Sequence, residues 1–585
     1  MTFGQTNLLT NIPNRDVMSL NGPWHYIIDP YETGFYNYRY EPYDKQSPIS
    51  GGFMLDAQAE TPQELIEYNF EKSPVLQVPG DWNSQSDVLT YYEGTIWYER
   101  KFDVDLNNIP AHVFLYFGAI NYESHVYLNG QKLGKHIGGF TPFNYEVTSL
   151  LKAQNSIVIK VDNKRYKEAV PTINTDWWNY GGITRDVLLI FEEETYVEDY
   201  SFNFRNEEIS GTINFAGTEL LSAPKIEIPE LKQSTLAKKN AAGQWTFTLS
   251  GKKAELWTPE NPKLYAINIS FDKNNFADQI GLRTIKTNGS KVELNGQSIF
   301  LKGICIHEEN PLTGGRVARP EEAKMLLTWA KELGCNYVRL AHYPHNEHMV
   351  RMAEKMGLLV WSEIPVYWTI DWSNPNTLAN AKNQLTTMIT RDRNRANVII
   401  WSMANETPPG PQRNAFLGEL VKTARALDGS RLISAALEIH TKKDDPNTIT
   451  MNDPFVDQVD IISFNQYIGW YWKTIDDCKS IKWDITQNKP VLISEFGAGA
   501  LQSNHGSAQH RWTEEFQAKL YSETLPMLER IPQFAGVSPW ILVDFKSPKR
   551  NLPGIQDGWN RKGLIGSNGI KKQAYLVLQS YYLNK

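Results

Sequence analysis

The first part of the chain consists of short runs in which apolar and polar residues alternate. Residues 112–120 (HVFLYFGAI) and 124–134 (SHVYLNGQKLG) are examples, and Gly, Pro and Asn separate such runs. Alternation with a period of two is typical of strands that bury one face. Asn129 and Gly130 lie between two runs and predict a two-residue hairpin, because both positions tolerate a positive φ. Residues 1–193 are therefore predicted to form a β-sandwich.

A second group of strand-like runs follows in residues 194–284. It includes residues 212–217 (TINFAG), 244–251 (QWTFTLSG) and 265–272 (YAINISFD). The length of this part and its strand pattern predict a small immunoglobulin-like β-sandwich.

From residue 285 onward, short apolar runs alternate with amphipathic helical stretches such as residues 320–334 and 346–357. This alternation is typical of βα units. Eight apolar runs predict strands at residues 300–305, 336–340, 358–363, 398–404, 431–435, 460–464, 490–495 and 536–542. Eight strands with helices between them fit a (β/α)8 barrel over residues 285–585. The predicted fold class is a multidomain β and α/β protein.

The charge and hydropathy of the chain exclude some partners. The formal net charge of −7 provides no broad cationic surface, so nucleic acid is not expected as a partner. No apolar run reaches the roughly 18 to 20 residues that span a bilayer, and no membrane association is expected. Residues 1–10 lack a basic region followed by an apolar stretch, so no signal peptide is expected there. The compartment and the oligomeric state stay open, with a cytoplasmic or an exported location and a homo-oligomer all among the options.

Aromatic residues and cysteines add little specific chemistry. Aromatic residues make up 12% of the chain, and their flat rings suit the faces of sugars, although packing is expected to account for most of them. Cys305, Cys335 and Cys478 are far apart and lack CxxC or Cys/His spacing. They are predicted to be buried thiols rather than disulfide partners or zinc ligands.

Acidic residues are few at the predicted carboxyl ends of the barrel strands, where the active site of such a barrel lies. They are Glu308, Glu309, Glu363, Glu406, Glu438, Glu495 and Asp544. A carboxylate in this position often caps a helix or pairs with an arginine, so position alone does not single one out. Glu406 in WSMANETP and Glu495 in VLISEFG differ from the rest by their sequence context.

Glu406 and Glu495 follow the fourth and seventh predicted strands, so both carboxyl groups can flank one sugar at the barrel mouth. Hydrolysis with retention needs two carboxyl groups about 5 Å apart, one attacking the anomeric carbon while the other protonates the departing oxygen. Asn405, immediately before Glu406, is a candidate to bond the sugar 2-hydroxyl. Such a double displacement requires neither a metal ion nor an organic cofactor.

Motifs distributed over nearly the whole chain carry a resemblance to a known family. In chain order they are PGDWN (79–83), GGFTPF (138–143), DWWNYGGITR (176–185), GICIHEE (303–309), RLAHYPH (339–345), ANE (404–406), ISEFG (493–497) and Trp540. One such motif is weakly specific, but the ordered set is highly specific. The sequence resembles glycoside hydrolase family 2, and most closely the β-glucuronidases within it. The resemblance implies a jelly-roll sandwich, an immunoglobulin-like sandwich and a catalytic barrel, with Glu406 as general acid/base and Glu495 as nucleophile of a retaining exo-β-glycosidase.

The same resemblance assigns further residues to the sugar pocket. It implies that Asp176 reaches into the barrel mouth to bind sugar hydroxyls, and that His307 donates to the sugar. It also implies that Tyr467 and Tyr471 lie near the nucleophile and that Trp540 forms a wall of the pocket. Taken without the resemblance, a turn acid, a core histidine and packing aromatics explain these residues equally well.

The loop after the eighth predicted strand contains an N-x-K motif, with Asn560 and Lys562 at its ends. In β-glucuronidases this motif holds the C6 carboxylate of the uronic acid, where an ammonium supplies charge and an amide supplies a directional hydrogen bond. Those enzymes often carry an arginine four residues before the motif, and here that residue is Gln556. Lys549 and Arg550 lie nearby in the sequence and are candidates to replace it.

The predicted substrate is a carbohydrate or a conjugate with a terminal β-D-glucuronide. Because of Gln556, a β-galacturonidase or a dual uronidase is an alternative. A family 2 β-galactosidase or β-mannosidase, in which the loop of Lys562 is simply solvated, is another. A carbohydrate-binding protein without activity belongs to a different class, and the intact contexts of Glu406 and Glu495 argue against it. The natural aglycone stays open.

Overall fold

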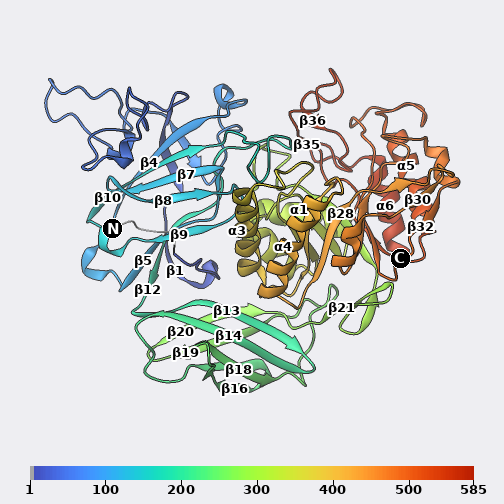
Figure 1. Cartoon of the computed structure of the whole chain (residues 1–585), viewed down its shortest axis with the longest axis horizontal. Helices are drawn as coiled ribbons and strands as arrows, with labels where there is room; N and C mark the ends of the chain where they lie inside the picture. The colour runs from blue at the N-terminus through green and yellow to red at the C-terminus, as the bar shows by residue number, and fades with distance from the viewer. Residues whose placement is uncertain (1–5) are drawn as a thin grey trace.

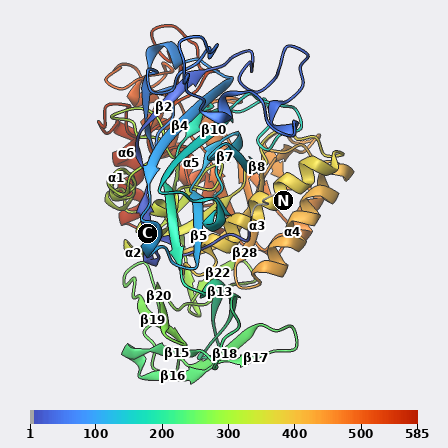
Figure 2. The ribbon, with the colours of Figure 1, turned by 90° about the vertical axis from the view of Figure 1, so that its left-hand side faces the viewer.

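The protein forms two β-sandwiches followed by a closed eight-stranded barrel (Figure 1). The computed structural model describes residues 6–585, so residues 1–5, where no signal peptide is expected, lie outside the described part. In Figure 1 the first sandwich is blue to cyan, the second is green and lies below it, and the barrel runs from yellow to red. Figure 2 shows the second sandwich extending away from the other two parts. The predicted fold class is confirmed.

Two antiparallel sheets form the first sandwich, with the strand orders β1-β12-β5-β9 and β3-β2-β4-β10-β7-β8. Their bounds are β1 (Asp16–Ser19), β2 (Gly22–Ile28), β3 (Val75–Val78), β4 (Thr95–Asp103), β5 (His112–Phe117), β7 (Glu123–Leu128), β8 (Gln131–Ile137), β9 (Phe143–Glu146), β10 (Gln154–Asp162) and β12 (Val187–Glu192). Side chains from both sheets, among them Trp24, Leu115 and Val126, share one core. The predicted hairpin is confirmed, since β7 and β8 pair across Asn129 and Gly130, whose φ angles are 52° and 78°.

The second sandwich consists of two antiparallel sheets of four strands each, β13-β14-β18-β17 and β16-β15-β19-β20. Their bounds are β13 (Thr195–Arg205), β14 (Glu208–Gly217), β15 (Lys225–Ile228), β16 (Gln233–Leu236), β17 (Lys238–Lys239), β18 (Trp245–Ser250), β19 (Tyr265–Phe271) and β20 (Asn274–Ile280). Every second residue of β19 is buried, from Tyr265 through Ile267 and Ile269 to Phe271. This is the period of two that the sequence shows.

The barrel closes through eight strands, each near its predicted position, and β24 pairs with β34 to complete the ring. The strands are β24 (Leu301–Ile306), β25 (Tyr337–Leu340), β26 (Leu359–Glu363), β27 (Val398–Asn405), β28 (Leu432–Leu437), β31 (Ile462–Asn465), β33 (Val491–Glu495) and β34 (Phe534–Val537). The helices are α1 (Pro320–Glu332), α2 (Glu347–Lys355), α3 (Pro375–Asp392), α4 (Pro411–Leu427), α5 (Glu514–Leu528) and α6 (Gln573–Leu583). The start of α2 is capped by Asn346, whose side chain accepts from the His348 N–H at 3.1 Å.

The eighth strand is shorter than predicted. The apolar run 536–542 predicts a strand through Trp540, but β34 ends at Val537. The Trp540 N–H instead donates to the carbonyl of Phe496 at 2.8 Å, in the loop after β33. Trp540 therefore lies in the segment beyond the strand. The prediction was wrong here because an apolar run in the sequence does not show where the hydrogen bonds between neighbouring strands end.

A buried ion pair joins the first sandwich to the mouth of the barrel. Arg185 donates to the Glu308 carboxylate at 2.9 Å and to the carbonyls of Phe140 and Pro344 at 2.8 and 2.7 Å. A buried ion pair is favourable only where hydrogen bonds satisfy both partners, as they do here. The contact fixes the first sandwich, and with it the loop that carries Asp176, against the barrel.

The three cysteines are buried and unpaired, as predicted. The thiol of Cys305 lies on β24 and contacts the carbonyl oxygens of Ser494 and Ser538 at 3.3 and 3.2 Å. Within residues 6–585, no helix combines the length and the apolar character needed to cross a membrane.

Candidate active site

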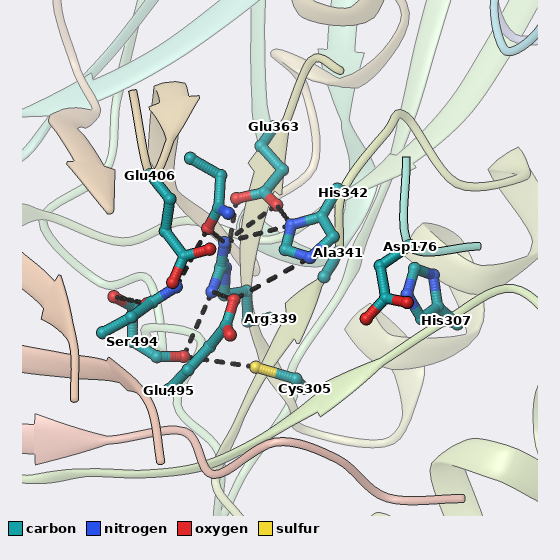
Figure 3. A network of polar contacts seen from close by, with 12 residues as sticks. Asp176, Cys305, His307, Arg339, Ala341, His342, Glu363, Glu406, Ser494 and Glu495 are labelled. Atoms are coloured by element: carbon teal, nitrogen blue, oxygen red, sulfur yellow. Dashed lines mark hydrogen bonds and ion pairs between the residues drawn. The ribbon is translucent and has the colours of Figure 1, made fainter. Parts of the chain in front are cut away.

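Glu495, the predicted nucleophile, is the last residue of β33 and is buried. The Arg339 guanidinium donates to its Oε1 at 2.8 Å, and the Tyr467 hydroxyl donates to its Oε2 at 2.6 Å. Each carboxylate oxygen is therefore held by one donor, which fixes the orientation of the group. Figure 3 shows Arg339 beside Glu495.

Arg339, on β25, is shared between two carboxylates. Its Nε and Nη2 donate to Glu363 at 3.1 Å each, while its Nη1 donates to Glu495. His342 Nδ1 lies 2.8 Å from Glu363, and the Trp361 indole N–H donates to Glu363 at 2.6 Å. Burial alone would raise the pKa of Glu363, but Arg339 and His342 lower it to about 2. Glu363 is therefore an ionised, fully bonded partner that orients Arg339.

The pKa of Glu495 is raised above its ordinary value. Burial is the largest cause, and the negative charge of Glu406 acts in the same direction. Arg339, His342 and the Tyr467 hydrogen bond act against it by favouring the ionised form. The influence of Glu406 means that the two carboxyl groups lie close enough to interact, as Figure 3 shows.

Glu406, the predicted acid/base, follows directly after β27 and is only partly buried. Its backbone has a φ of 48°, a left-handed conformation that is uncommon for a residue with a side chain and is often found at functional sites. The Trp368 indole N–H donates to its Oε2 at 2.8 Å. Within the described chain, its Oε1 has no hydrogen-bond partner, which leaves that oxygen free to exchange a proton.

Asn405 presents an amide nitrogen to the same space. Its Oδ1 accepts from Arg339 at 2.7 Å and from Asn465 at 3.3 Å. Its Nδ2 is buried without a hydrogen-bond partner among residues 6–585. A buried donor without a partner is costly, so this geometry suits an amide that donates to a substrate hydroxyl.

The loop of the first sandwich that carries Asp176 reaches the barrel mouth. Arg550 pairs with the Asp176 carboxylate, Ser547 donates to it at 2.6 Å, and Asn560 Nδ2 donates to it at 3.1 Å. The resemblance implied that Asp176 binds sugar hydroxyls and that the Asn560 amide faces the substrate carboxylate. In the structure these two side chains bond to each other, and Arg550 neutralises Asp176.

Lys562 is buried, and its ammonium has no carboxylate within ion-pair distance in the described part of the chain. Its Nζ donates to the Tyr471 hydroxyl at 2.7 Å and lies 5.6 Å from the centre of the Tyr467 ring and 5.8 Å from that of Trp470. Of the two tyrosines expected near the nucleophile, Tyr467 hydrogen-bonds to Glu495, whereas the Tyr471 hydroxyl accepts from Lys562. The centres of the two tyrosine rings lie 5.1 Å apart. A buried cation without a counterion favours an anionic ligand.

His307 and Trp540 both pack against His342. The His307 Nδ1 lies 3.1 Å from the Tyr343 hydroxyl, and its Nε2 is buried without a partner among the described residues. Burial, followed by the charge of His342, places the pKa of His307 well below its ordinary value, so its ring is neutral. The Trp540 ring stacks on His342 with centroids 4.7 Å apart and meets His307 edge-on at 5.1 Å.

Known proteins match this chain over most of its length. The model of the glycosyl hydrolases family 2 sugar binding domain matches residues 17–192, and that of the glycosyl hydrolases family 2 TIM barrel domain matches residues 285–558. The chain belongs to glycosyl hydrolase family 2. It is therefore a glycoside hydrolase, and its barrel and first sandwich are those of this family.

Individual relatives of this family 2 hydrolase are distant in sequence. A β-glucuronidase from Paenibacillus borealis is 26% identical over 97% of this chain and 96% of its own length. A solved β-glucuronidase from an uncultured Clostridium species has a TM-score of 0.81 at 23% identity, with 100% of both chains covered. A solved family 2 β-galacturonidase from Eisenbergiella tayi, bound to glycerol, has a TM-score of 0.80 at 23% identity, with 100% of this chain and 98% of that chain covered.

Several further residues of this family 2 site have no role that the sequence pattern predicts. Glu363 is one of the acidic residues at the predicted strand ends, but its sequence context assigned it no role. A search for basic residues at the same strand ends would have added Arg339. Tyr367 and Trp368 lie on the loop after β26 and carry no such signal. The Tyr367 hydroxyl has its pKa raised by burial and then by the negative charges of Asp176 and both predicted catalytic carboxylates. The Tyr367 ring packs against His342, with the ring centroids 4.8 Å apart.

Proposed function

We propose that this glycoside hydrolase is a retaining exo-β-glycosidase that removes terminal β-D-glucuronides. The observation that carries the proposal is the position of Tyr467. Its hydroxyl donates to Glu495, while its ring lies 5.6 Å from the unpaired ammonium of Lys562. The predicted nucleophile and the unpaired cation thus contact one side chain, so a substrate anion at Lys562 belongs to the same sugar ring that Glu495 attacks.

The proposed reaction is a double displacement. Glu495 attacks the anomeric carbon as Glu406 protonates the departing glycosidic oxygen, which forms a covalent glycosyl ester. Glu406 then removes a proton from water, which attacks the anomeric carbon and releases Glu495 and a sugar of the original configuration. The different surroundings of the two groups support these roles: Glu495 is buried and bonded to Arg339, which favours its ionised form, whereas Glu406 is partly exposed with a free oxygen.

The ionised state of Glu495 leads to a prediction for Tyr467→Phe. This change removes a hydrogen bond to the Glu495 carboxylate and keeps the ring. The ionised form loses stability relative to the protonated form, so the pKa of Glu495 rises. Since attack needs the ionised form, the acid limb of the kcat/KM profile should move to higher pH. Tyr471→Phe, which removes a hydroxyl bonded to Lys562 instead, is the matched control and should leave the limb in place. An acid limb that responds equally to both changes would contradict the role of Glu495.

The proposed sugar specificity is tested by Lys562→Ala. A uronide differs from an ordinary hexoside at C6, where a carboxylate replaces a hydroxymethyl group, so only charge or directional bonding there discriminates. Loss of a partly buried ammonium that pairs with this carboxylate should cost roughly 2 to 5 kcal/mol, or about 30- to several-thousand-fold in kcat/KM. The expected loss applies to an aryl β-glucuronide, while any activity on the matching aryl β-glucoside should stay unchanged or improve.

Lys571→Ala is a suitable control for the Lys562 variant. Lys571 follows on the same segment, but it pairs with Glu332 at 2.7 Å on the surface, and its loss should change neither activity. A parallel fall of both activities in Lys562→Ala, or an unaffected glucuronide, would favour a family 2 β-galactosidase or β-mannosidase instead.

A β-galacturonidase is the second candidate. Gln556 lines the same cavity as Lys562 and stands where β-glucuronidases often carry an arginine, and a solved β-galacturonidase has this fold. Both activities would use the same carboxylate site and differ at the 4-hydroxyl. The ratio of kcat/KM for aryl β-glucuronide to that for aryl β-galacturonide decides between them.

A further inference from the structure

A cavity of about 200 Å³ opens beside Lys562. Four cationic side chains line it, and none of its lining residues is acidic: the cations are Arg511, Arg550, Arg561 and Lys562. A liquid water molecule occupies about 30 Å³, so the cavity has room for a carboxylate with several waters. Its lining favours an anion.

Two of these cations have carboxylate partners. Arg550 pairs with Asp176, as described above. Arg561 donates to the Ile555 carbonyl at 3.0 Å and lies 3.5 Å from the Asp544 carboxylate. Asp176 therefore neutralises Arg550, whereas Arg561 shares Asp544 with Lys572, whose ammonium lies 2.8 Å from that carboxylate.

The other two cations lack carboxylate partners in the part of the chain that the structure describes. Lys562 is bonded only to the Tyr471 hydroxyl through its ammonium. Arg511 is exposed, and its guanidinium lies over the Trp470 ring at 5.0 Å from the centroid. The Lys562 ammonium lies 5.8 Å from the centre of the same ring, so two positive charges lie beside Trp470 and line one cavity.

The loop that carries Arg511 is attached to the N-x-K segment. The Ala500 N–H donates to the Arg561 carbonyl at 2.9 Å, and the Leu501 N–H donates to the Trp512 carbonyl at 2.9 Å. Trp512 has a φ of 75° and meets Trp470 edge-on with centroids 5.0 Å apart. A bulky residue in the left-handed region is a genuine departure from ordinary backbone, and here it turns the chain so that the residue before it stacks on Trp470.

We propose that Arg511 is a specificity-determining residue of this enzyme, the second cation that binds the substrate carboxylate together with Lys562. A carboxylate has two oxygens, and a planar guanidinium can donate to it with two parallel N–H groups, whereas an ammonium acts as a point charge. Arg511, from the loop between β33 and α5, thus supplies the guanidinium that the neutral side chain of Gln556 cannot. This inference rests on the proposed uronidase function.

The test compares Arg511→Ala and Arg511→Lys with the unaltered enzyme on an aryl β-glucuronide and the matching aryl β-glucoside. Arg511→Ala should lower kcat/KM for the glucuronide by about 10- to 100-fold, as expected for hydrogen bonds to a charged group, and leave the glucoside unchanged. The loss should fall mainly on KM, because the carboxylate is bound alike in the ground state and the transition state. Arg511→Lys should restore part of it.

Arg39→Ala is the matched control, since Arg39 is also exposed and stacked, with its guanidinium 5.2 Å from the centroid of the Tyr38 ring. Competitive inhibition by free D-glucuronate provides a readout without turnover, and its inhibition constant should rise by the same factor in Arg511→Ala. Because both cations would bind one carboxylate, the Arg511→Ala/Lys562→Ala double variant should lose less than the product of the two single losses.

Three outcomes overturn the inference and are distinguishable. If Lys562→Ala loses glucuronide activity selectively and Arg511→Ala does not, the role of Arg511 is wrong while the proposed function stands. If Arg511→Ala lowers both activities equally, the residue stabilises the loop and does not bind the substrate carboxylate. If the unaltered enzyme prefers the neutral glycoside and is not inhibited by D-glucuronate, the proposed function fails and the inference fails with it.

Discussion

Glu495→Gln is expected to lower kcat by about 10⁴-fold or more, because the covalent route through this carboxylate is lost. The amide keeps the size of the side chain and can still bond to Tyr467, so the loss should reflect chemistry. Circular dichroism and the melting temperature should show that the fold is retained. A 2-fluoro glycoside that traps the glycosyl-enzyme should label Glu495, and peptide mapping by mass spectrometry locates the label.

Glu438 provides the matched control for this experiment. It follows the fifth barrel strand, is partly exposed, and its pKa is raised first by burial and then by the charge of Glu406. The Arg339 and Tyr467 donors bond to Glu495 and not to Glu438, so Glu438→Gln should leave kcat within the same order of magnitude as the unaltered enzyme. A label on Glu438 or Glu363 would show that the nucleophile had been assigned to the wrong strand.

Glu406→Ala should show a loss that depends on the leaving group. General acid catalysis contributes about 10²- to 10⁴-fold, so substrates with poor leaving groups should lose activity in this range. Activated aryl glycosides need no proton on the departing oxygen and should lose much less in the glycosylation step. Added azide should then restore turnover, because this small anion attacks the glycosyl-enzyme without a general base.

The product of azide rescue is itself informative. A β-glycosyl azide, detected by NMR, would show that azide enters from the face that the aglycone has left, which is where a retaining enzyme places water. Equal losses for good and poor leaving groups, with no effect of azide, would argue that Glu406 only supports the site through its bond with Trp368.

The two carboxylates differ in ways that suit these different expectations. Arg339 and Tyr467 hold both oxygens of Glu495 and leave little freedom for the group. Glu406 has one bonded and one free oxygen on a residue whose φ is 48°. A nucleophile has to keep one position and one charge, whereas an acid/base has to gain and lose a proton during each turnover.

The sequence by itself determined the fold class and the approximate position of each barrel strand. Periods of two and the alternation of apolar runs with amphipathic helices are local properties, and burial of one face imposes them directly. The sequence also placed Glu406 and Glu495 at one end of the barrel, because parallel strands end on the same face. The exception was Trp540, since the apolar run continues beyond the point at which the ladder stops.

Only the tertiary structure decided which side chains contact one another. Asp176 and Arg550 are 374 residues apart and come from different parts of the fold, so no local pattern predicts their pairing. Tyr467 and Tyr471 are four residues apart, yet one bonds to Glu495 and the other to Lys562. The direction of a loop side chain depends on what packs against it, and charge balance in a buried site depends on the sum of all neighbours. For this reason the sequence predicted the type of reaction. The pairing of Arg550 with Asp176 and the position of Arg511 over Trp470 depend on the tertiary structure.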